Sequence, residues 1–427
     1  MYARRRHGKR TWRQVEGVVR IPSRKLEYAY YVAIIYSFMA PAVGLDIPVV
    51  AGLMLLVISA TCIWQFRSSF KAVYGPIALL LACATSFFFI QIFVHGEDIM
   101  DSNNMRVFIT WVFGLIIVQS LCLRQGFCLR FPLVLFGIGA TTLPFVGFNP
   151  AAAPGGVEMA RVDIGPFGNP AGLADWFAFC AVFFTIFGIE ARPNSFRIGA
   201  WLLAVVCLFV VTLTIERGAL VGAVLAITVG CRSVLKRSFV PVLALVILVW
   251  VVAVTGLFDQ AFSKYAERGM EETGREILWP MAVDRFLTSP LVGVGESNIL
   301  LPIPESSKKS PPHNAFLHIA LSSGVLPFAF FLAFWIQAAR KSVFHTRGSE
   351  DNPFRLPYLT YMLGMLMIGD LPFTNYGALL TTSLAAGTVI PYDVMRSLLI
   401  VPARARPLVQ VRRSRSRPVT TTARSRF

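Results

Sequence analysis

Charge is scarce in this sequence, and its scarcity excludes an ordinary soluble domain. Asp, Glu, Lys and Arg make up 15% of the 427 residues, whereas soluble domains usually carry about 25%. Hydrophobic residues make up 55%, including 35 phenylalanines. Apolar runs of roughly 20 residues recur along the chain, which is the length that crosses about 30 Å of hydrocarbon. We therefore predict an all-α, polytopic integral membrane protein.

Several patterns of metal and nucleotide chemistry are also missing. The sequence contains no Asp-x-Asp pair, no cluster of Cys and His, and no Gly-Lys-Ser/Thr loop for phosphate. Its seven cysteines lie in or beside apolar runs, which is typical of small buried residues and not of disulfides or metal sites. We expect no metal site and no cofactor. The first apolar run follows a basic segment ending at Lys25 and has the length of a span, so we expect no cleavable signal peptide.

Hydropathy predicts about twelve transmembrane helices. The predicted spans are residues 26–45, 47–65, 75–95, 106–122, 130–148, 171–189, 198–215, 218–231, 239–258, 314–337, 356–369 and 376–395. Glu216-Arg217-Gly218 interrupts an apolar stretch that is too long for one span. We therefore predict a hairpin with its tip at these residues.

The distribution of charge orients these spans. With the N-terminus inside, the inner tails and loops hold most of the 40 Lys and Arg residues, and the outer loops hold most of the 23 acidic residues, as the positive-inside rule requires. Both termini are then cytoplasmic. The net charge of +17 reflects this topology and contact with the lipid bilayer, so we expect no nucleic acid partner.

This topology divides the chain into five segments. They are a basic cytoplasmic tail (1–25), transmembrane helices 1–9 (26–258), one large outer loop (259–312), transmembrane helices 10–12 (313–395) and a basic, disordered cytoplasmic tail (396–427). The last segment resembles an RNA-binding arginine-serine tract, but beside a final span we expect it to contact lipid. The outer loop is long enough to need structure or function of its own. We predict in it a helix over 273–286 and a glycine-rich turn at 293–295.

Polar residues that are far apart in the sequence meet on the predicted outer face. Arg217 is at the hairpin tip, where an arginine near lipid needs a partner or a water-filled cavity; a Glu216–Arg217 pair that closes the turn is the alternative. Arg275 lies near the start of the predicted loop helix, where it is alternatively a solvated residue. His313 and Asn314 directly precede the tenth span, and Asn314 is also a normal helix cap.

Asn169 lies on the same face, and with Pro170 it is also typical of a cap followed by the first helical residue. Two arginines can hold a pyrophosphate by charge-assisted hydrogen bonds. Histidine is the side chain best suited to act as a base near neutral pH. Such a histidine can deprotonate a hydroxyl that attacks the carbon bonded to the pyrophosphate.

At these residues the sequence resembles the O-antigen ligase and polysaccharide polymerase superfamily of bacterial envelope membrane proteins, over roughly residues 165–335. Four segments carry the resemblance: Gly165-Pro166-Phe167-Gly168-Asn169-Pro170, Glu216-Arg217-Gly218, Thr273-Gly274-Arg275 through Trp279 to Ser289-Pro290-Leu291-Val292-Gly293-Val294-Gly295, and His313-Asn314-Ala315-Phe316-Leu317 with Gly324. The family often has Ser where this chain has Glu216.

The resemblance implies a fold like that of the C-type glycosyltransferases and a site on the periplasmic face of the inner membrane. It implies transfer of a glycan from an undecaprenyl-diphosphate carrier to a sugar hydroxyl of the lipid A core or a growing polysaccharide, without metal and with inversion. His313 and Asn314 would be catalytic, and Arg217 and Arg275 would bind the donor diphosphate. Further substrate-binding candidates are Asn169, Glu216 and Trp279.

Two alternatives stay open at this stage. A polymerase of the same superfamily uses the same donor and differs in the acceptor. A transporter of lipid-linked oligosaccharides is an alternative of another class, although such proteins commonly carry charged residues in mid-membrane and internal repeats, which this sequence lacks. The sequence identifies neither the sugars nor their linkage.

Overall fold

The computed structural model describes residues 22–39, 48–98, 103–124, 126–145, 147–149, 161–163, 170–190, 194–214, 216–235, 275–302, 309–344, 353–368 and 376–387. These residues are mostly helical, which agrees with the predicted all-α membrane protein. The helices before the predicted outer loop are α2 (Arg24–Met39), α3 (Pro48–Gln65), α4 (Phe70–Tyr74), α5 (Ala78–Phe93), α6 (Asn103–Leu121), α7 (Phe127–Thr142), α8 (Pro170–Glu190), α9 (Asn194–Leu213) and α10 (Arg217–Leu235). The later ones are α13 (Arg275–Thr288), α14 (Ala315–Ser323), α15 (Val325–Phe344), α16 (Arg355–Ile368) and α17 (Tyr376–Ala385).

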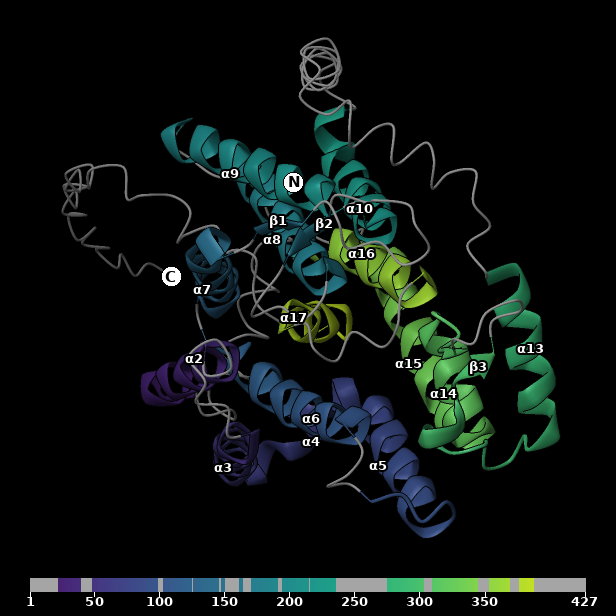
Figure 1. The fold of residues 1–427 in the computed structure, drawn as a ribbon. Coiled ribbons are helices and arrows are strands. Elements are labelled where there is room, and N and C mark those ends of the chain that lie inside the picture. The colour runs from purple at the N-terminus through teal and green to yellow at the C-terminus, as the bar shows by residue number, and fades with distance from the viewer. Residues whose placement is uncertain are drawn as a thin grey trace, which may run out of the picture.

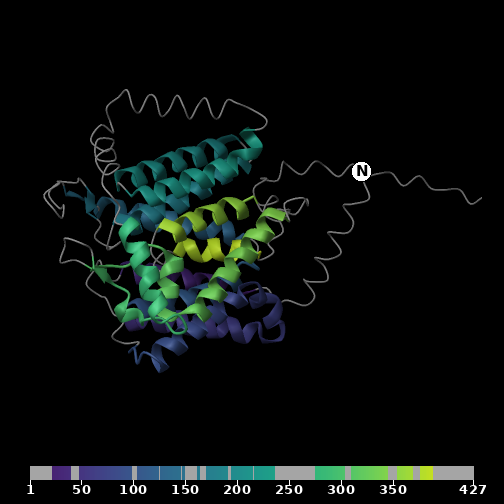
Figure 2. The ribbon, with the colours of Figure 1, turned by 90° about the vertical axis from the view of Figure 1, so that its right-hand side faces the viewer.

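The helices are arranged in tiers (Figures 1 and 2). The α9–α10 hairpin and α8 form one side. Helices α16 and α17 lie next to them, and the opposite side is formed by α2, α3, α5 and α6. Helices α13 to α15 cover one flank (Figure 1). Since α15 packs on α5 and α14 packs on α13, this flank joins the predicted outer loop to the N-terminal helices.

Helix α8 is the core of the described fold. Phe177, Phe179, Cys180 and Phe183 have no exposed surface, because α9, α10 and α17 pack around this helix. A Cβ on Gly377 of α17 would come within 2.5 Å of the Phe179 ring. Only glycine lets these two helices approach so closely, as in other tightly packed membrane helices.

Ten of the twelve predicted spans each overlap one described α-helix, span 314–337 overlaps two, and span 239–258 lies outside the described residues. Within the described part, three helical stretches are long and apolar enough to cross a membrane: Arg67–Phe93, Ala171–Glu190 and Ser195–Leu213. Shorter apolar helices are Val50–Gln65, Phe108–Leu121, Phe127–Thr142 and Gly218–Arg232. The chain is therefore a helical membrane protein, and the number of spans stays a prediction.

The tenth predicted span is wrong as a single helix. Residues 314–337 contain the whole of one helix and the first part of another, since α14 stops at Ser323 and α15 begins at Val325. Gly324 between them has φ 80° and ψ −171°, a backbone conformation that glycine adopts without steric cost. An apolar run predicts burial, but it carries no sign of a break that depends on a distant turn.

Short elements occupy the predicted outer segments. The predicted loop helix over 273–286 corresponds to α13, with a shift of two residues. Two small antiparallel ladders were not predicted: β1 (Gly147–Asn149) pairs with β2 (Arg161–Asp163), and β3 (Leu301–Pro302) pairs with β4 (Lys309–Ser310). The second ladder ends directly before the Pro-Pro-His-Asn segment. It brings residues 301–302 beside residues 309–310.

A buried ion pair ties the start of α2 to α7. Glu27 is 2% exposed and accepts two hydrogen bonds from Arg130, at 2.7 and 2.8 Å. Arg124 lies 2.7 Å from the second carboxylate oxygen, and the Tyr31 hydroxyl donates to the first at 2.8 Å. Two guanidinium groups and one hydroxyl therefore compensate the desolvation of this carboxylate.

Candidate active site

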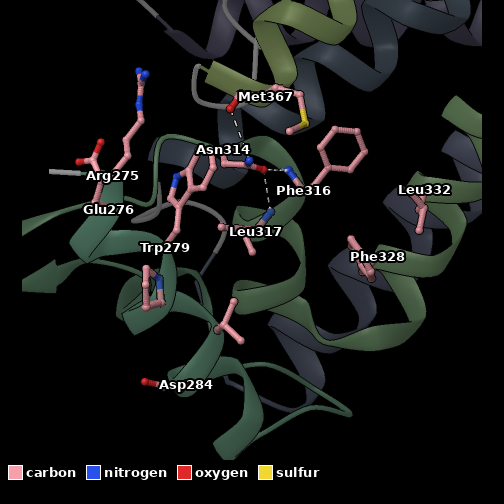
Figure 3. Close-up of a pocket in the computed structure, with 12 residues that line it drawn as sticks. Arg275, Glu276, Trp279, Asp284, Asn314, Phe316, Leu317, Phe328, Leu332 and Met367 are labelled. Atoms are coloured by element: carbon pink, nitrogen blue, oxygen red, sulfur yellow. Dashed lines mark hydrogen bonds between the residues drawn. The ribbon is translucent and has the colours of Figure 1, made fainter. Parts of the chain in front are cut away.

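A pocket of about 820 Å³ opens between α13, α14, α15 and α16 (Figure 3). Arg275 and Glu276 lie at one end of it, at the start of α13, while Phe328 and Leu332 lie on the opposite side, on α15. Asn314 lies between these two ends. The other lining residues are Trp279, Pro280, Val283, Asp284, Phe316, Leu317 and Met367. The pocket thus has a charged end and a largely apolar wall.

Helix α13 brings Arg275 to this pocket. The helix begins at Arg275 itself, and the side chain is half-buried. One turn later, the Trp279 indole N–H donates to the Pro312 carbonyl at 2.9 Å. This bond fixes α13 against the backbone directly before His313. Arg275, Trp279 and Asn314 therefore line one pocket.

His313 occupies an unusual backbone position. Its φ of 47° is the only positive value among the described non-glycine residues, and histidine is one of the residue types that tolerate this region. The Nε2 atom lies 2.9 Å from the Ser310 hydroxyl, and the side chain is half-buried. Such backbone strain persists only where the surroundings hold it, as at ligand sites and active sites.

Asn314 caps α14, as its alternative interpretation predicted. Its side-chain oxygen accepts hydrogen bonds from the backbone N–H groups of Phe316 and Leu317, at 3.0 and 3.1 Å. Its amide nitrogen donates to the Met367 carbonyl at 3.4 Å (Figure 3). Asn314 is 4% exposed. It therefore connects the start of α14 to the end of α16, directly beside His313.

The glycine-rich turn holds the other end of α14. The Val294 and Gly295 N–H groups donate to the Leu321 and Ser322 carbonyls at 2.8 and 3.1 Å, which would otherwise lack helical partners. A Cβ on Gly293 would come within 2.5 Å of the Ser322 backbone, and one on Gly324 would collide with the Leu291 carbonyl. Backbone therefore meets backbone here, and both glycines are needed for this contact.

Helix packing brings the hairpin tip to the same end of the molecule. Gly230 of α10 lies against Pro357 of α16, and Gly222 lies against Tyr361, so the two helices are antiparallel. Continuing this register places Arg217, the first residue of α10, near the end of α16, where Met367 contacts Asn314.

The remaining hairpin and cap candidates are described only in part. Glu216 is half-buried, and its carbonyl accepts from Leu220 N at 3.3 Å, as expected of the residue before a helix. The side chain of Arg217 and the whole of Asn169 lie outside the described residues. Helix α8 begins at Pro170, the predicted first helical residue.

Three further polar residues near the site were missed by the sequence analysis. Asp175 lies in the first turns of α8, in electrostatic range of Glu216, and its carbonyl accepts from the Tyr361 hydroxyl at 3.0 Å. An acid inside an apolar run was the signal that could have revealed it. Glu296 and His318 form a buried pair behind α14. Nothing local in the sequence indicates that they meet.

Metal ligands do not gather in the part of the chain that the structure describes. No three His, Cys, Asp or Glu residues lie close enough there to hold a metal ion. All seven cysteines are free thiols, and six of them are buried. The polar groups that line the pocket are suited to binding an anion and a hydroxyl by hydrogen bonds.

Comparison with known families gives one match. Residues 176–332 match the family model described as O-antigen ligase. This segment runs from α8 into α15 and contains Glu216, Arg217, Arg275, Trp279, His313 and Asn314, while Asn169 precedes it. No curated protein matches the chain significantly.

Proposed function

Because this chain belongs to the O-antigen ligase and polysaccharide polymerase superfamily, we propose that it transfers a glycan from an undecaprenyl-diphosphate carrier to a sugar hydroxyl. The reaction takes place at the periplasmic face of the bacterial inner membrane, with both termini in the cytoplasm. Between the two activities of the superfamily we favour the ligase, with lipid A core as acceptor. A polymerase, with a carrier-linked glycan as acceptor, is the alternative.

The observation that carries this proposal is the two-sided character of the pocket. A polyprenyl diphosphate glycan is a long apolar chain joined to a doubly charged group. Arg275 brings a planar guanidinium whose geometry suits a diphosphate, and the wall of Phe316, Phe328 and Leu332 offers apolar contact to the first prenyl units. Ligand sites commonly combine an apolar wall with a few polar groups that fix orientation.

In the proposed reaction, His313 acts as the general base. Its imidazole takes the proton of the acceptor hydroxyl, and the oxygen attacks the anomeric carbon of the donor sugar. The bond from that carbon to the diphosphate oxygen breaks, and the carrier diphosphate leaves with the electron pair. Attack from the opposite side inverts the anomeric centre. Arg217 and Arg275 stabilise the charge on the leaving diphosphate.

The other candidate residues support this geometry. Asn314 holds the start of α14, and Trp279 fixes the backbone before His313 through the Pro312 carbonyl. Glu216 and Asn169, at the starts of α10 and α8, are proposed to contact the sugar part of the donor. Preorganised donors of this kind account for much of the rate enhancement of enzymes. The residues proposed here act without a metal ion.

A variant at His313 tests the proposal. His313→Ala removes the imidazole but also places alanine at φ 47°, so His313→Asn is the sharper variant, since asparagine accepts this conformation. We expect both to abolish transfer by purified protein supplied with lipid-linked donor, and EDTA to leave wild-type transfer unchanged. Full activity of His313→Asn would refute the assigned base, and loss of activity in EDTA that a divalent ion restores would refute the metal-free reaction.

The polysaccharide of a deletion strain separates ligase from polymerase. For a ligase, we expect loss of all attached polymer and accumulation of carrier-linked polymer, which wild-type protein restores and His313→Ala does not. For a polymerase, a single attached repeat unit would persist, or only a secreted polymer would be lost.

A further inference from the structure

A buried carboxylate–imidazole pair lies behind the site and does not line the pocket. Glu296 and His318 are 5% and 6% exposed, and His318 Nε2 lies 2.9 and 3.1 Å from the two Glu296 carboxylate oxygens. His318 follows Asn314 by one turn of α14, and its backbone N–H donates to the Asn314 carbonyl at 2.8 Å. The pair therefore joins the loop after the glycine-rich turn to the first turns of the helix that begins beside His313.

Helix α5 holds the same pair from the other side. Gln91 has no exposed surface. Its side-chain oxygen accepts from the Glu296 N–H at 2.9 Å, and its side-chain nitrogen donates to the Ser322 carbonyl at 2.9 Å. One amide of the N-terminal half thus fixes both the loop that carries Glu296 and the end of α14.

The shortness of α14 makes such contacts necessary. The helix has 9 residues, and Gly324 separates it from α15, so the longer helix does not determine how α14 is rotated about its own axis. The apolar cluster around Leu278 and Leu321 is a non-directional contact that tolerates several rotations. The hydrogen bond from His318 Nε2, shared between the two oxygens of the Glu296 carboxylate, selects a single rotation.

Energetics also argue against a role in stability alone. Removing a carboxylate and an imidazole from water is unfavourable, and apolar residues of similar volume often stabilise a core as well or better. A polar pair in this place is therefore better explained by the geometry that it imposes than by the stability that it adds.

We propose that Glu296 and His318 are positioning residues, which hold α14 in the rotation that presents Asn314 to the pocket, directly after His313. Neither residue touches the substrate. The effect on transfer rests on the function proposed above, whereas the effect on the first turn of α14 does not.

Hydrogen exchange tests the positioning directly. The amides of Phe316 and Leu317 are protected by the Asn314 side chain, so their exchange reports the first turn of α14. In full-length protein, we expect Glu296→Gln and His318→Gln to accelerate this exchange at least tenfold, and the swapped double variant E296H/H318E to restore most of the protection. Glu27→Gln is the matched control, because it disrupts a buried ion pair that has no contact with α14; it should leave this exchange unchanged.

Kinetics then separate positioning from folding. We expect Glu296→Gln and His318→Gln to lower kcat at least tenfold, with the KM for the lipid-linked donor changed less than threefold, and the swap to recover kcat. If the single variants fail to fold, the apolar pair E296M/H318L keeps the packing and should give folded protein with low kcat and fast exchange.

The outcomes distinguish the two proposals. Wild-type exchange in the single variants, or wild-type exchange and kcat in the apolar pair, would overturn the positioning role. If the wild-type protein transferred no glycan but exchange at Phe316 and Leu317 was accelerated in the single variants, the positioning role would be supported and the proposed function refuted.

Discussion

At the scale of single residues, the site depends on side chains whose partners are already arranged. His313 is held by the Ser310 hydroxyl and by a strained backbone, and Asn314 has committed its side-chain oxygen to two amides. Asn314 is therefore available to the substrate only through its side-chain amide nitrogen. His313 is the residue of this segment that we propose as the general base.

The hydroxyl of Ser310 should orient the imidazole of His313. We expect Ser310→Ala to lower kcat by about 2- to 10-fold, since one hydrogen bond contributes roughly 1 kcal/mol, with donor KM unchanged. Thr288→Ala is the control, because that exposed hydroxyl contacts only its own helix, at the Arg285 carbonyl. An equal effect of the two variants on steady-state transfer would show that the contact between Ser310 and His313 has no catalytic importance.

Arg275 should bind the donor through its planar group and not only through charge. We expect Arg275→Lys to raise the KM for the lipid-linked donor about 3- to 10-fold, since an ammonium cannot form two parallel bonds to a diphosphate, and Arg275→Gln to raise it further. Arg285→Gln on the same helix lies outside the pocket lining and should leave KM unchanged. Identical donor KM values for the variants at 275 and 285 would contradict the assignment.

At the scale of elements, the site is built where short helices end. The helix α14 is fixed at its start by Asn314, at its end by the glycine-rich turn, and at its side by Glu296. Because each contact comes from a different part of the chain, the position of α14 is determined jointly by α5, the outer loop and α16.

The close contact of two backbones at Gly324 can be tested by adding one methyl group. Gly324→Ala should destabilise the protein by well over 1 kcal/mol, because alanine disfavours φ 80° and its Cβ would collide with the Leu291 carbonyl. Gly137→Ala in α7 meets no atom within 4 Å and should be neutral or slightly stabilising. Thermal unfolding in detergent compares the two, and equal melting temperatures would contradict the tight packing at Gly324.

Elements of this kind differ in how far a sequence predicts them. The Asn314 cap was predictable because its partners are the next amides in the chain, and α13 was predictable within two residues for the same local reason. The break at Gly324 was not, since it exists only because the turn at Gly293 packs against it. The contact between Glu296 and His318 is equally non-local.

At the scale of the whole molecule, helix packing gathers residues that are distant in the sequence. The antiparallel α10–α16 pair carries Arg217 toward Met367, and Met367 contacts Asn314. The positive-inside rule predicts that Arg217, Arg275 and Asn314 lie on one face, because each span reverses the direction of the chain. Charge counts did not predict that Arg275, Trp279 and Asn314 line one pocket, which depends on side-chain packing.

The orientation of this assembly in the membrane can be tested with single cysteines in intact cells. Thr288→Cys, exposed at the end of α13, should react with a membrane-impermeant maleimide added from outside. Ser195→Cys, exposed at the start of α9, should react only after the inner membrane is opened. The positive-inside rule places these two positions on opposite faces.

The native thiols should contribute little background to this labelling. Six of them are buried, and Cys231 is half-buried near the end of α10, on the predicted cytoplasmic side. The unmodified chain should therefore give little signal from outside and serves as the control. If Ser195→Cys were labelled in intact cells and Thr288→Cys were not, the whole topology would be inverted. The pocket of Arg275 and Asn314 would then face the cytoplasm, where no acceptor that has already crossed the membrane could reach it.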